Sequence, residues 1–308
     1  MRTSSCVAAL LASTFTNAAA VIIPRQSKPK TQVSETLYQE LLYYGRYAPT
    51  YPEAPCQNPP SNTVVQGFAN SNPDTEMTLF RSDTDRELVM AFPGTASLGD
   101  LLTDLGSIMV PYNSSGIYCP DCKVHAGVLN AWNGIEPQAK EVLDQAIAQY
   151  PNYKFVIVGH SLGAAIAQFA YNGLASQGYK IRAAYTYGQF RVGNPAFADL
   201  VDKLSGSSDT CVGNYHRVTH ADDGVPQILT TQEGYRHPRN EYWFEAGPGN
   251  NSAVTTTFQC HGQEPTDCNY SQFAIGVVGI NLAHIKYPGV NIVGCGGFGP
   301  LVGTELPF

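Results

Sequence analysis

The pentapeptide Gly159-His160-Ser161-Leu162-Gly163 is the part of this chain whose residue types and spacing most clearly indicate chemistry. It follows the apolar run 153–158 and precedes the small-residue run 164–171, an order typical of a tight turn from a strand into a helix. Such a turn strains the backbone of Ser161, and the flanking glycines remove Cβ atoms that would collide with the strand and the helix. We expect the Ser161 hydroxyl to be a nucleophile at the C-terminal edge of a sheet. The Leu162 N–H and the helix N-terminus would face negative charge forming beside it.

A serine hydroxyl is a poor nucleophile near neutral pH, so Ser161 needs a histidine base and a carboxylate that orients the base. In hydrolases with this turn the chain order is serine, then aspartate or glutamate, then histidine. Asp222 and Asp223 directly follow an expected strand, where catalytic groups collect in open α/β sheets. Two adjacent residues cannot both point at one imidazole, so we expect one of them to serve. The downstream histidines are His216, His220, His237, His261 and His284, and position in the chain favours His284.

The elements that must position these groups alternate along the chain. Ser34 can cap a helix containing Leu37, Tyr38, Leu41 and Leu42. Further helices are expected at 132–150, 164–171 and 195–204, and strands at 64–68, 76–80, 87–92, 153–158, 181–187 and 214–219. The strands 76–80 and 87–92 lie close enough in sequence for an antiparallel meander. No linker or repeat divides the pattern, so we expect one α/β-hydrolase-like domain, with a central mixed sheet flanked by helices.

Composition excludes several classes of function. The net charge is −7 and only 18 Lys and Arg are scattered over 308 residues, which argues against a nucleic-acid partner. No nucleotide-binding fingerprint follows a strand, so we expect no cofactor. The pair Cys119 and Cys122 has no second cysteine or histidine pair with ligand spacing, so we expect a structural clip and no metal.

The N-terminus predicts secretion. Arg2 precedes an apolar stretch, 6–15, and Ala18-Ala19-Ala20 suits a signal peptidase, so residues 1–20 are interpreted as a signal peptide. Residues 21–32 would be a propeptide or a flexible arm, followed by the domain 33–308. No later apolar run is long enough to span a membrane. We expect a secreted, monomeric glycoprotein with Asn-x-Ser/Thr acceptors at Asn113, Asn250 and Asn269.

Six ordered blocks carry a more specific resemblance. They are AFPGTAS (91–97), GHSLGAA (159–165), RVGNPAF (191–197), RVTHADDGVP (217–226), GYRHPRNEYWF (234–244) and NLAHIKYPG (281–289). In these blocks the chain resembles the filamentous-fungal branch of the class 3 lipases, which includes feruloyl esterases. The similarity runs from about residue 33 to about residue 297.

The resemblance implies roles for individual residues. It selects Asp223 and His284 as the partners of Ser161. It also implies an oxyanion hole made by the Thr95 backbone N–H and hydroxyl together with the Leu162 N–H. One departure is Pro93, where relatives commonly carry Arg.

The resemblance also implies three disulfides, Cys56–Cys295, Cys119–Cys122 and Cys260–Cys268. Discounting Cys6 of the signal peptide, Cys211 is then left unpaired. We expect Cys211 to be a buried small hydrophobic residue.

The segment 96–110 decides the expected substrate. Its Leu98, Leu101, Leu102 and Leu105 recur at helical spacing, and family lipases hold a lid helix at this position. The resemblance therefore favours a serine carboxylic-ester hydrolase acting on mono-, di- or triacylglycerols at an oil–water interface, through an acyl-enzyme.

Three alternatives remain open. The leucines could belong to an ordinary surface helix that packs on the sheet. The disulfide pattern and the segment 255–268 look closer to the feruloyl esterases, so a feruloyl or other non-lipolytic esterase is a second hypothesis. A non-catalytic surface-binding protein on a hydrolase scaffold is a third, against which the intact Ser161, Asp223 and His284 speak.

Overall fold

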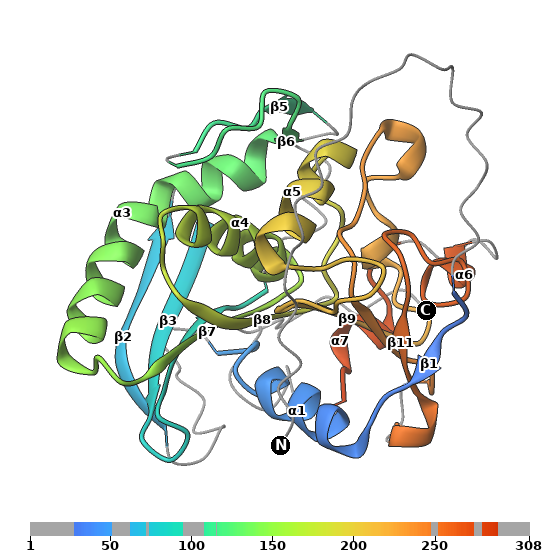
Figure 1. The fold of residues 1–308 in the computed structure, drawn as a ribbon, viewed down its shortest axis with the longest axis horizontal. Helices are drawn as coiled ribbons and strands as arrows, with labels where there is room; N and C mark the ends of the chain where they lie inside the picture. The colour runs from blue at the N-terminus through green and yellow to red at the C-terminus, as the bar shows by residue number, and fades with distance from the viewer. Residues whose placement is uncertain are drawn as a thin grey trace, which may run out of the picture.

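The centre of the molecule is a mixed β-sheet. The computed structural model describes residues 28–50, 62–71, 74–94, 108–114, 116–247, 252–273 and 279–288. Over these ranges nine strands form one sheet in the order β1-β11-β10-β9-β8-β7-β4-β3-β2, and β5 pairs with β6 separately (Figure 1). The strands are β1 (Thr31–Gln32), β2 (Asn62–Ser71), β3 (Asp74–Ser82), β4 (Glu87–Phe92), β5 (Met109–Pro111), β6 (Lys123–His125), β7 (Lys154–His160), β8 (Ile181–Tyr187), β9 (Tyr215–His220), β10 (Glu241–Phe244) and β11 (Thr257–Cys260).

Strand direction divides the sheet into three parts. The strands β2, β3 and β4 pair antiparallel. For β3 and β4 this is the meander that the sequence predicted. The run β4-β7-β8-β9-β10 is parallel, and β11 and β1 close the other edge antiparallel. The expected central mixed sheet, with the strands 76–80 and 87–92 antiparallel, is therefore confirmed.

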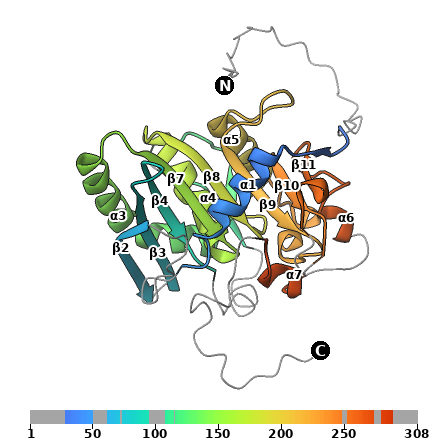
Figure 2. The ribbon, with the colours of Figure 1, turned by 90° about the horizontal axis from the view of Figure 1, so that it is seen from below.

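Helices cover both faces of the sheet. In Figure 1, α3, α4 and α5 lie on one side, and Figure 2 shows α1 crossing the opposite face. Alternate residues of β4 serve the two layers: Leu88, Met90 and Phe92 join the cluster under α3 and α4, while Val89 and Ala91 join the cluster under α1. The helices are α1 (Glu35–Gly45), α3 (Ala126–Gln149), α4 (Leu162–Ser176), α5 (Pro195–Ser205), α6 (Tyr270–Phe273) and α7 (Leu282–Ile285), with 3-10 turns η1 (Val225–Gln227), η2 (Thr231–Glu233) and η3 (Val254–Thr256).

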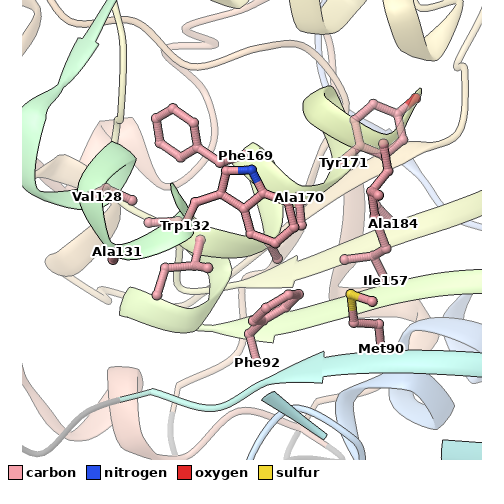
Figure 3. Packing of buried hydrophobic residues seen from close by; sticks show 14 of the residues in the cluster. Met90, Phe92, Val128, Ala131, Trp132, Ile157, Phe169, Ala170, Tyr171 and Ala184 are labelled. Atoms are coloured by element: carbon pink, nitrogen blue, oxygen red, sulfur yellow. The ribbon is translucent and has the colours of Figure 1, made fainter. Parts of the chain in front are cut away.

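Trp132 of α3 fills the space between α4 and the sheet. Its ring is fully buried beside Phe169 and Ala170 of α4, and it meets Phe92 of β4 edge to face at 6.3 Å between ring centroids (Figure 3). Every residue from Leu162 to Leu174 is buried, so α4 is covered on all sides. The alanines and glycines of this run allow α4 to pack closely on the sheet. Truncating a buried tryptophan typically costs about 3–5 kcal/mol, so this contact is a main support of the layer behind the site.

The last residues of the expected N-terminal arm are ordered. Residues 28–32 are not a loose arm, because β1 pairs with β11 at the edge of the sheet. The Lys30 backbone N–H donates to Asp267 at 2.7 Å, and its ammonium contacts Glu245 at 2.6 Å and lies 4.4 Å from the ring centroid of Trp243. The predicted signal peptide and residues 21–27 lie outside the described residues.

Disulfides tie two loops. The bonds Cys119–Cys122 and Cys260–Cys268 are both present in the structure, whereas the expected pair of Cys56 and Cys295 lies outside the described residues. The prediction for Cys211 is wrong, because this half-buried residue is disulfide-bonded and not free. Among the described residues, no helix is both long and apolar enough to cross a membrane.

Candidate active site

Ser161 lies at the turn between β7 and α4 with strained backbone angles, φ 57° and ψ −123°. Both flanking glycines are needed for this turn. A Cβ on Gly159 would lie 2.5 Å from the Gly163 carbonyl oxygen, and a Cβ on Gly163 would lie 2.1 Å from the Pro93 carbonyl oxygen. The elbow therefore forms where β7, α4 and the end of β4 meet, and only residues without a side chain fit there.

Three of the predicted side chains come together at this turn. His284 Nε2 lies 2.9 Å from Ser161 Oγ, and His284 Nδ1 lies 3.0 Å from each carboxylate oxygen of Asp223. All three residues are buried, with exposed fractions of 2%, 3% and 0% for Ser161, His284 and Asp223. They come from the elbow, from α7 and from the loop after β9. An imidazole placed between a hydroxyl and a carboxylate can remove the hydroxyl proton, which is the arrangement of a serine nucleophile used for acyl transfer.

The geometry separates the residues that the sequence left as alternatives. Of the five candidate histidines, all of which are described, His284 alone contacts Ser161. The others contact Tyr185 (His216), the carbonyls of Ala246 and Ala283 (His220), the Pro226 carbonyl (His237) and Thr31 (His261). Asp222 contributes its backbone carbonyl, which accepts a hydrogen bond from the Asn281 amide at 2.6 Å.

Asp223 is held as a carboxylate. Its burial alone would raise the pKa of the carboxyl group, but His284, the Tyr287 hydroxyl and the Val225 N–H lower it, and the net direction is below the usual value. Asn269 fixes the backbone of Asp223, because the Asn269 amide donates a hydrogen bond to the Asp223 backbone carbonyl at 3.0 Å. The carboxylate is thus charged and fixed in direction, as a group that orients an imidazole must be.

The backbone of His284 is fixed by a side-chain cap. Asn281 precedes α7, and its carbonyl oxygen accepts a hydrogen bond from the His284 N–H at 3.1 Å. Because the Asn281 side chain also binds the Asp222 carbonyl, it joins the two segments that carry His284 and Asp223.

Gly188, at the end of β8, is a site residue that the sequence analysis missed. Its φ is +60°, and a Cβ there would lie 2.8 Å from His284 Cε1 and 3.0 Å from Asp223 Oδ2. Tyr287 and Asn281 were also missed, although both lie in the NLAHIKYPG block quoted above. No motif marked Gly188, because its role depends on contacts with residues far along the chain.

The residues expected to form an oxyanion hole and a lid lie only partly within the described ranges. Leu162 begins α4, where backbone N–H groups have no partner within the helix. Gly94 approaches the nucleophile, since a Cβ there would lie 3.1 Å from Ser161 Cβ. The residues Thr95, Leu98, Leu101, Leu102 and Leu105 lie outside the described ranges.

One predicted glycosylation acceptor is contradicted. Asn269 has an exposed fraction of 0%, and its amide donates to the carbonyls of Ala221 and Asp223. A glycan could not be accommodated there without breaking these bonds. Asn113 is exposed, and Asn250 lies outside the described residues.

Within the described ranges no group of three or more His, Cys, Asp and Glu side chains is placed to hold a metal ion.

Comparisons with known proteins agree with this geometry. A family model described as Lipase (class 3) matches residues 89–233. Secreted mono- and diacylglycerol lipase 1 of Fusarium solani is 38% identical over 168 residues, which are 54% of this chain and 46% of that protein. Secreted mono- and diacylglycerol lipase A of Penicillium cyclopium is 33% identical over 196 residues, which are 63% of this chain and 60% of that protein. The chain thus spans about half to three fifths of the length of these curated relatives.

Solved structures extend the likeness over most of the chain. The crystal structure of Lip2 lipase from Yarrowia lipolytica matches with a TM-score of 0.75 at 26% identity, covering 85% of this chain and 96% of that one. The fold is therefore the α/β-hydrolase fold, and over its central part the chain is similar in sequence to class 3 lipases of fungi.

Proposed function

We propose that this protein is a secreted serine ester hydrolase that cleaves mono-, di- or triacylglycerols at an oil–water interface through an acyl-enzyme. The observation that carries the proposal is the buried chain of contacts from Ser161 Oγ through His284 to Asp223. The names of the relatives, which include secreted mono- and diacylglycerol lipases, support the substrate class and the secreted location.

The reaction proceeds in two halves. Ser161 Oγ attacks the ester carbonyl carbon while His284 Nε2 takes the hydroxyl proton, and Asp223 stabilises the imidazolium. The tetrahedral intermediate collapses as His284 passes this proton to the leaving alcohol, which leaves the acyl group on Ser161. Water, deprotonated by His284, then attacks the acyl-enzyme, and the acid departs as the Ser161 hydroxyl is restored.

The remaining roles follow from the sequence. The Leu162 N–H, together with the Thr95 N–H and hydroxyl, would bind the oxyanion, and losing one such donor typically lowers kcat about 10²- to 10³-fold. The leucines at 98, 101 and 102 would form the inner face of a lid. Cleavage of the signal peptide 1–20 and a glycan at Asn113 fit a monomeric secreted protein.

The lipase hypothesis is tested with three substrates side by side: an emulsified long-chain triacylglycerol, methyl ferulate and a soluble short-chain ester. We expect the wild-type protein to hydrolyse the emulsion and the Ser161→Ala variant to have lost the activity. Hydrolysis confined to ferulate would favour the feruloyl esterase hypothesis, with which the Cys260–Cys268 loop agrees. Binding to the emulsion without hydrolysis of any ester would favour a surface-binding protein.

A further inference from the structure

Two buried histidines outside the triad contact the short helix that carries His284. His160 Nε2 lies 3.0 Å from the His284 carbonyl oxygen, and His220 Nδ1 lies 2.9 Å from the Ala283 carbonyl oxygen. Their exposed fractions are 4% and 1%. Because α7 has only four residues, it cannot satisfy its own last carbonyls. Two imidazole side chains supply donors to consecutive carbonyls instead.

His160 acts as a neutral donor. Burial, and next the charge of His284, lower the pKa of His160 to about 3, so its ring carries one N–H near neutral pH. A carbonyl oxygen only accepts, so that N–H is at Nε2 and points at the His284 carbonyl. The residue before the nucleophile thereby holds the backbone of the base, which fixes the elbow and α7 relative to each other.

His220 contacts a carbonyl with each ring nitrogen. Nδ1 faces Ala283, and Nε2 lies 3.0 Å from the carbonyl oxygen of Ala246, just after β10. Both contacts are hydrogen bonds only when both nitrogens carry hydrogen, because a neutral ring has one N–H. A doubly protonated ring would tie α7 to the end of β10, whereas a neutral ring would leave two acceptors facing each other at one of these contacts.

The groups around His220 come from three elements. Tyr287, in the segment after α7, places its ring centroid 5.4 Å from that of His220. Asp223, in the loop after β9, donates its backbone N–H to the His220 carbonyl at 2.8 Å. Phe244 of β10 pairs with His220 in the sheet and carries no charge. The ring is thus enclosed by the segment after α7, and its backbone is fixed by the loop after β9 and by β10.

We propose that His160 and His220 are positioning residues that hold the consecutive carbonyls of α7, His220 as a doubly protonated ring, and so set the distance between His284 Nε2 and Ser161 Oγ. Misplacing a catalytic group by about 1 Å can cost about 10²-fold in rate, whereas substrate binding does not use these contacts. The kinetic part of the inference rests on the proposed ester hydrolysis.

The kinetic test compares three variants on a soluble short-chain ester. His220→Phe keeps a ring and removes both donors, and His220→Gln keeps a donor for one carbonyl. The control is His216→Phe, because His216 lies on the same strand and its ring stacks on that of Tyr185, with 5.0 Å between the ring centroids. We expect His220→Phe to lower kcat about 10- to 100-fold, with KM changed less than about twofold. His220→Gln should recover part of the loss in kcat, and His216→Phe should match the wild type. Unchanged kcat in a folded His220→Phe protein would overturn the positioning role.

A spectroscopic test does not depend on activity. In protein labelled with ring ¹⁵N-histidine, the His220 signals are assigned by their loss in His220→Gln and examined at pH 7. We expect hydrogen on both ring nitrogens, and the His284 ring signals to shift in His220→Gln but not in His216→Phe. One N–H on His220 would overturn the doubly protonated ring, and unmoved His284 signals would overturn positioning. Failure of the proposed function would instead appear as a wild-type protein that hydrolyses no ester.

Discussion

The Tyr287 hydroxyl donates a hydrogen bond to Asp223 Oδ2, one of the two oxygens that face His284 Nδ1. Both residues are buried. Burial, and next the nearby Asp223 carboxylate, raise the pKa of Tyr287 well above its ordinary value. Tyr287 is therefore a neutral donor near neutral pH. The carboxylate that contacts the His284 ring is thus itself held by a residue three positions after His284.

Replacing Tyr287 by Phe should weaken the orientation of Asp223. A hydrogen bond to a charged group contributes about 1.5–3 kcal/mol, and if about half of this appears in the barrier, kcat falls roughly 3- to 15-fold. The pKa of Asp223 should also rise, because a donor to the carboxylate is lost. The control is Tyr179→Phe, which removes a similar bond from a tyrosine to Asp144 at 2.7 Å on the surface. Equal kcat values for the two variants would argue against this role.

The two adjacent aspartates should respond differently to amide substitution. Asp223→Asn removes the charge that stabilises the imidazolium and favours the wrong tautomer, so we expect kcat to fall about 10⁴-fold. Asp222→Asn should leave kcat within about threefold, since only the Asp222 backbone carbonyl is used. Steady-state kinetics of the two variants measure this. A severe loss in Asp222→Asn with an active Asp223→Asn would exchange the two assignments.

Gly188→Ala should damage catalysis more than stability. The added Cβ would fall within 3.0 Å of atoms of both His284 and Asp223, so the pair must separate, and we expect kcat to fall at least about 10²-fold. The matched control is Gly178→Ala, where φ is also positive, +92°, and nothing lies within 4 Å of the new Cβ. Both variants bear a similar backbone cost of about 1–2 kcal/mol, visible in urea unfolding. Similar kcat values for both would show that contact with the triad is not the cause.

Acid should destabilise the fold through His216, a half-buried histidine whose pKa is lowered in the folded state. Burial lowers the pKa of His216 to about 4, with Glu40 opposing and Arg182 adding to the shift. In the unfolded chain the value is about 6.5, so between pH 6.5 and 4 the unfolded state binds a proton that the folded state does not. The free energy of unfolding therefore falls as the pH is lowered through this window, by roughly 3 kcal/mol from this residue.

The same variant that serves as a kinetic control tests this linkage. His216→Phe keeps a ring against Tyr185 and Tyr242 and removes the titration. Urea unfolding at a series of pH values should show a shallower acid decline in His216→Phe than in the wild type. Superimposable curves would mean that His216 does not contribute to acid sensitivity.

The sequence predicted those parts of the site whose cause is local. The elbow at Ser161 requires glycine at 159 and 163 and an apolar strand before them, and all of these are adjacent in the chain. The strand 87–92 and the helix that begins at Pro195 were also predicted with their observed ends or within one residue of them. The resemblance, rather than spacing, selected Asp223 over Asp222.

Other features depend on residues distant in sequence and were missed. The strand β10 has four residues, all buried, which is too short to show a period. The contact of Gly188 with His284, and the contacts of His160 and His220 with α7, join positions from 63 to 124 residues apart. Asn269 had the pattern of a glycosylation acceptor, but the folded loop after Cys268 turns its amide inward.

The central claim is that His284 and Asp223 activate Ser161. The most direct measurement is labelling of the purified protein with a fluorophosphonate, followed by mass spectrometry of its peptides, in the wild type and in the Ser161→Ala and His284→Ala variants. We expect one adduct per molecule, on the peptide that contains Ser161, no adduct in Ser161→Ala and strongly slowed labelling in His284→Ala. An unlabelled wild-type protein, or labelling that persists in Ser161→Ala, would contradict the account.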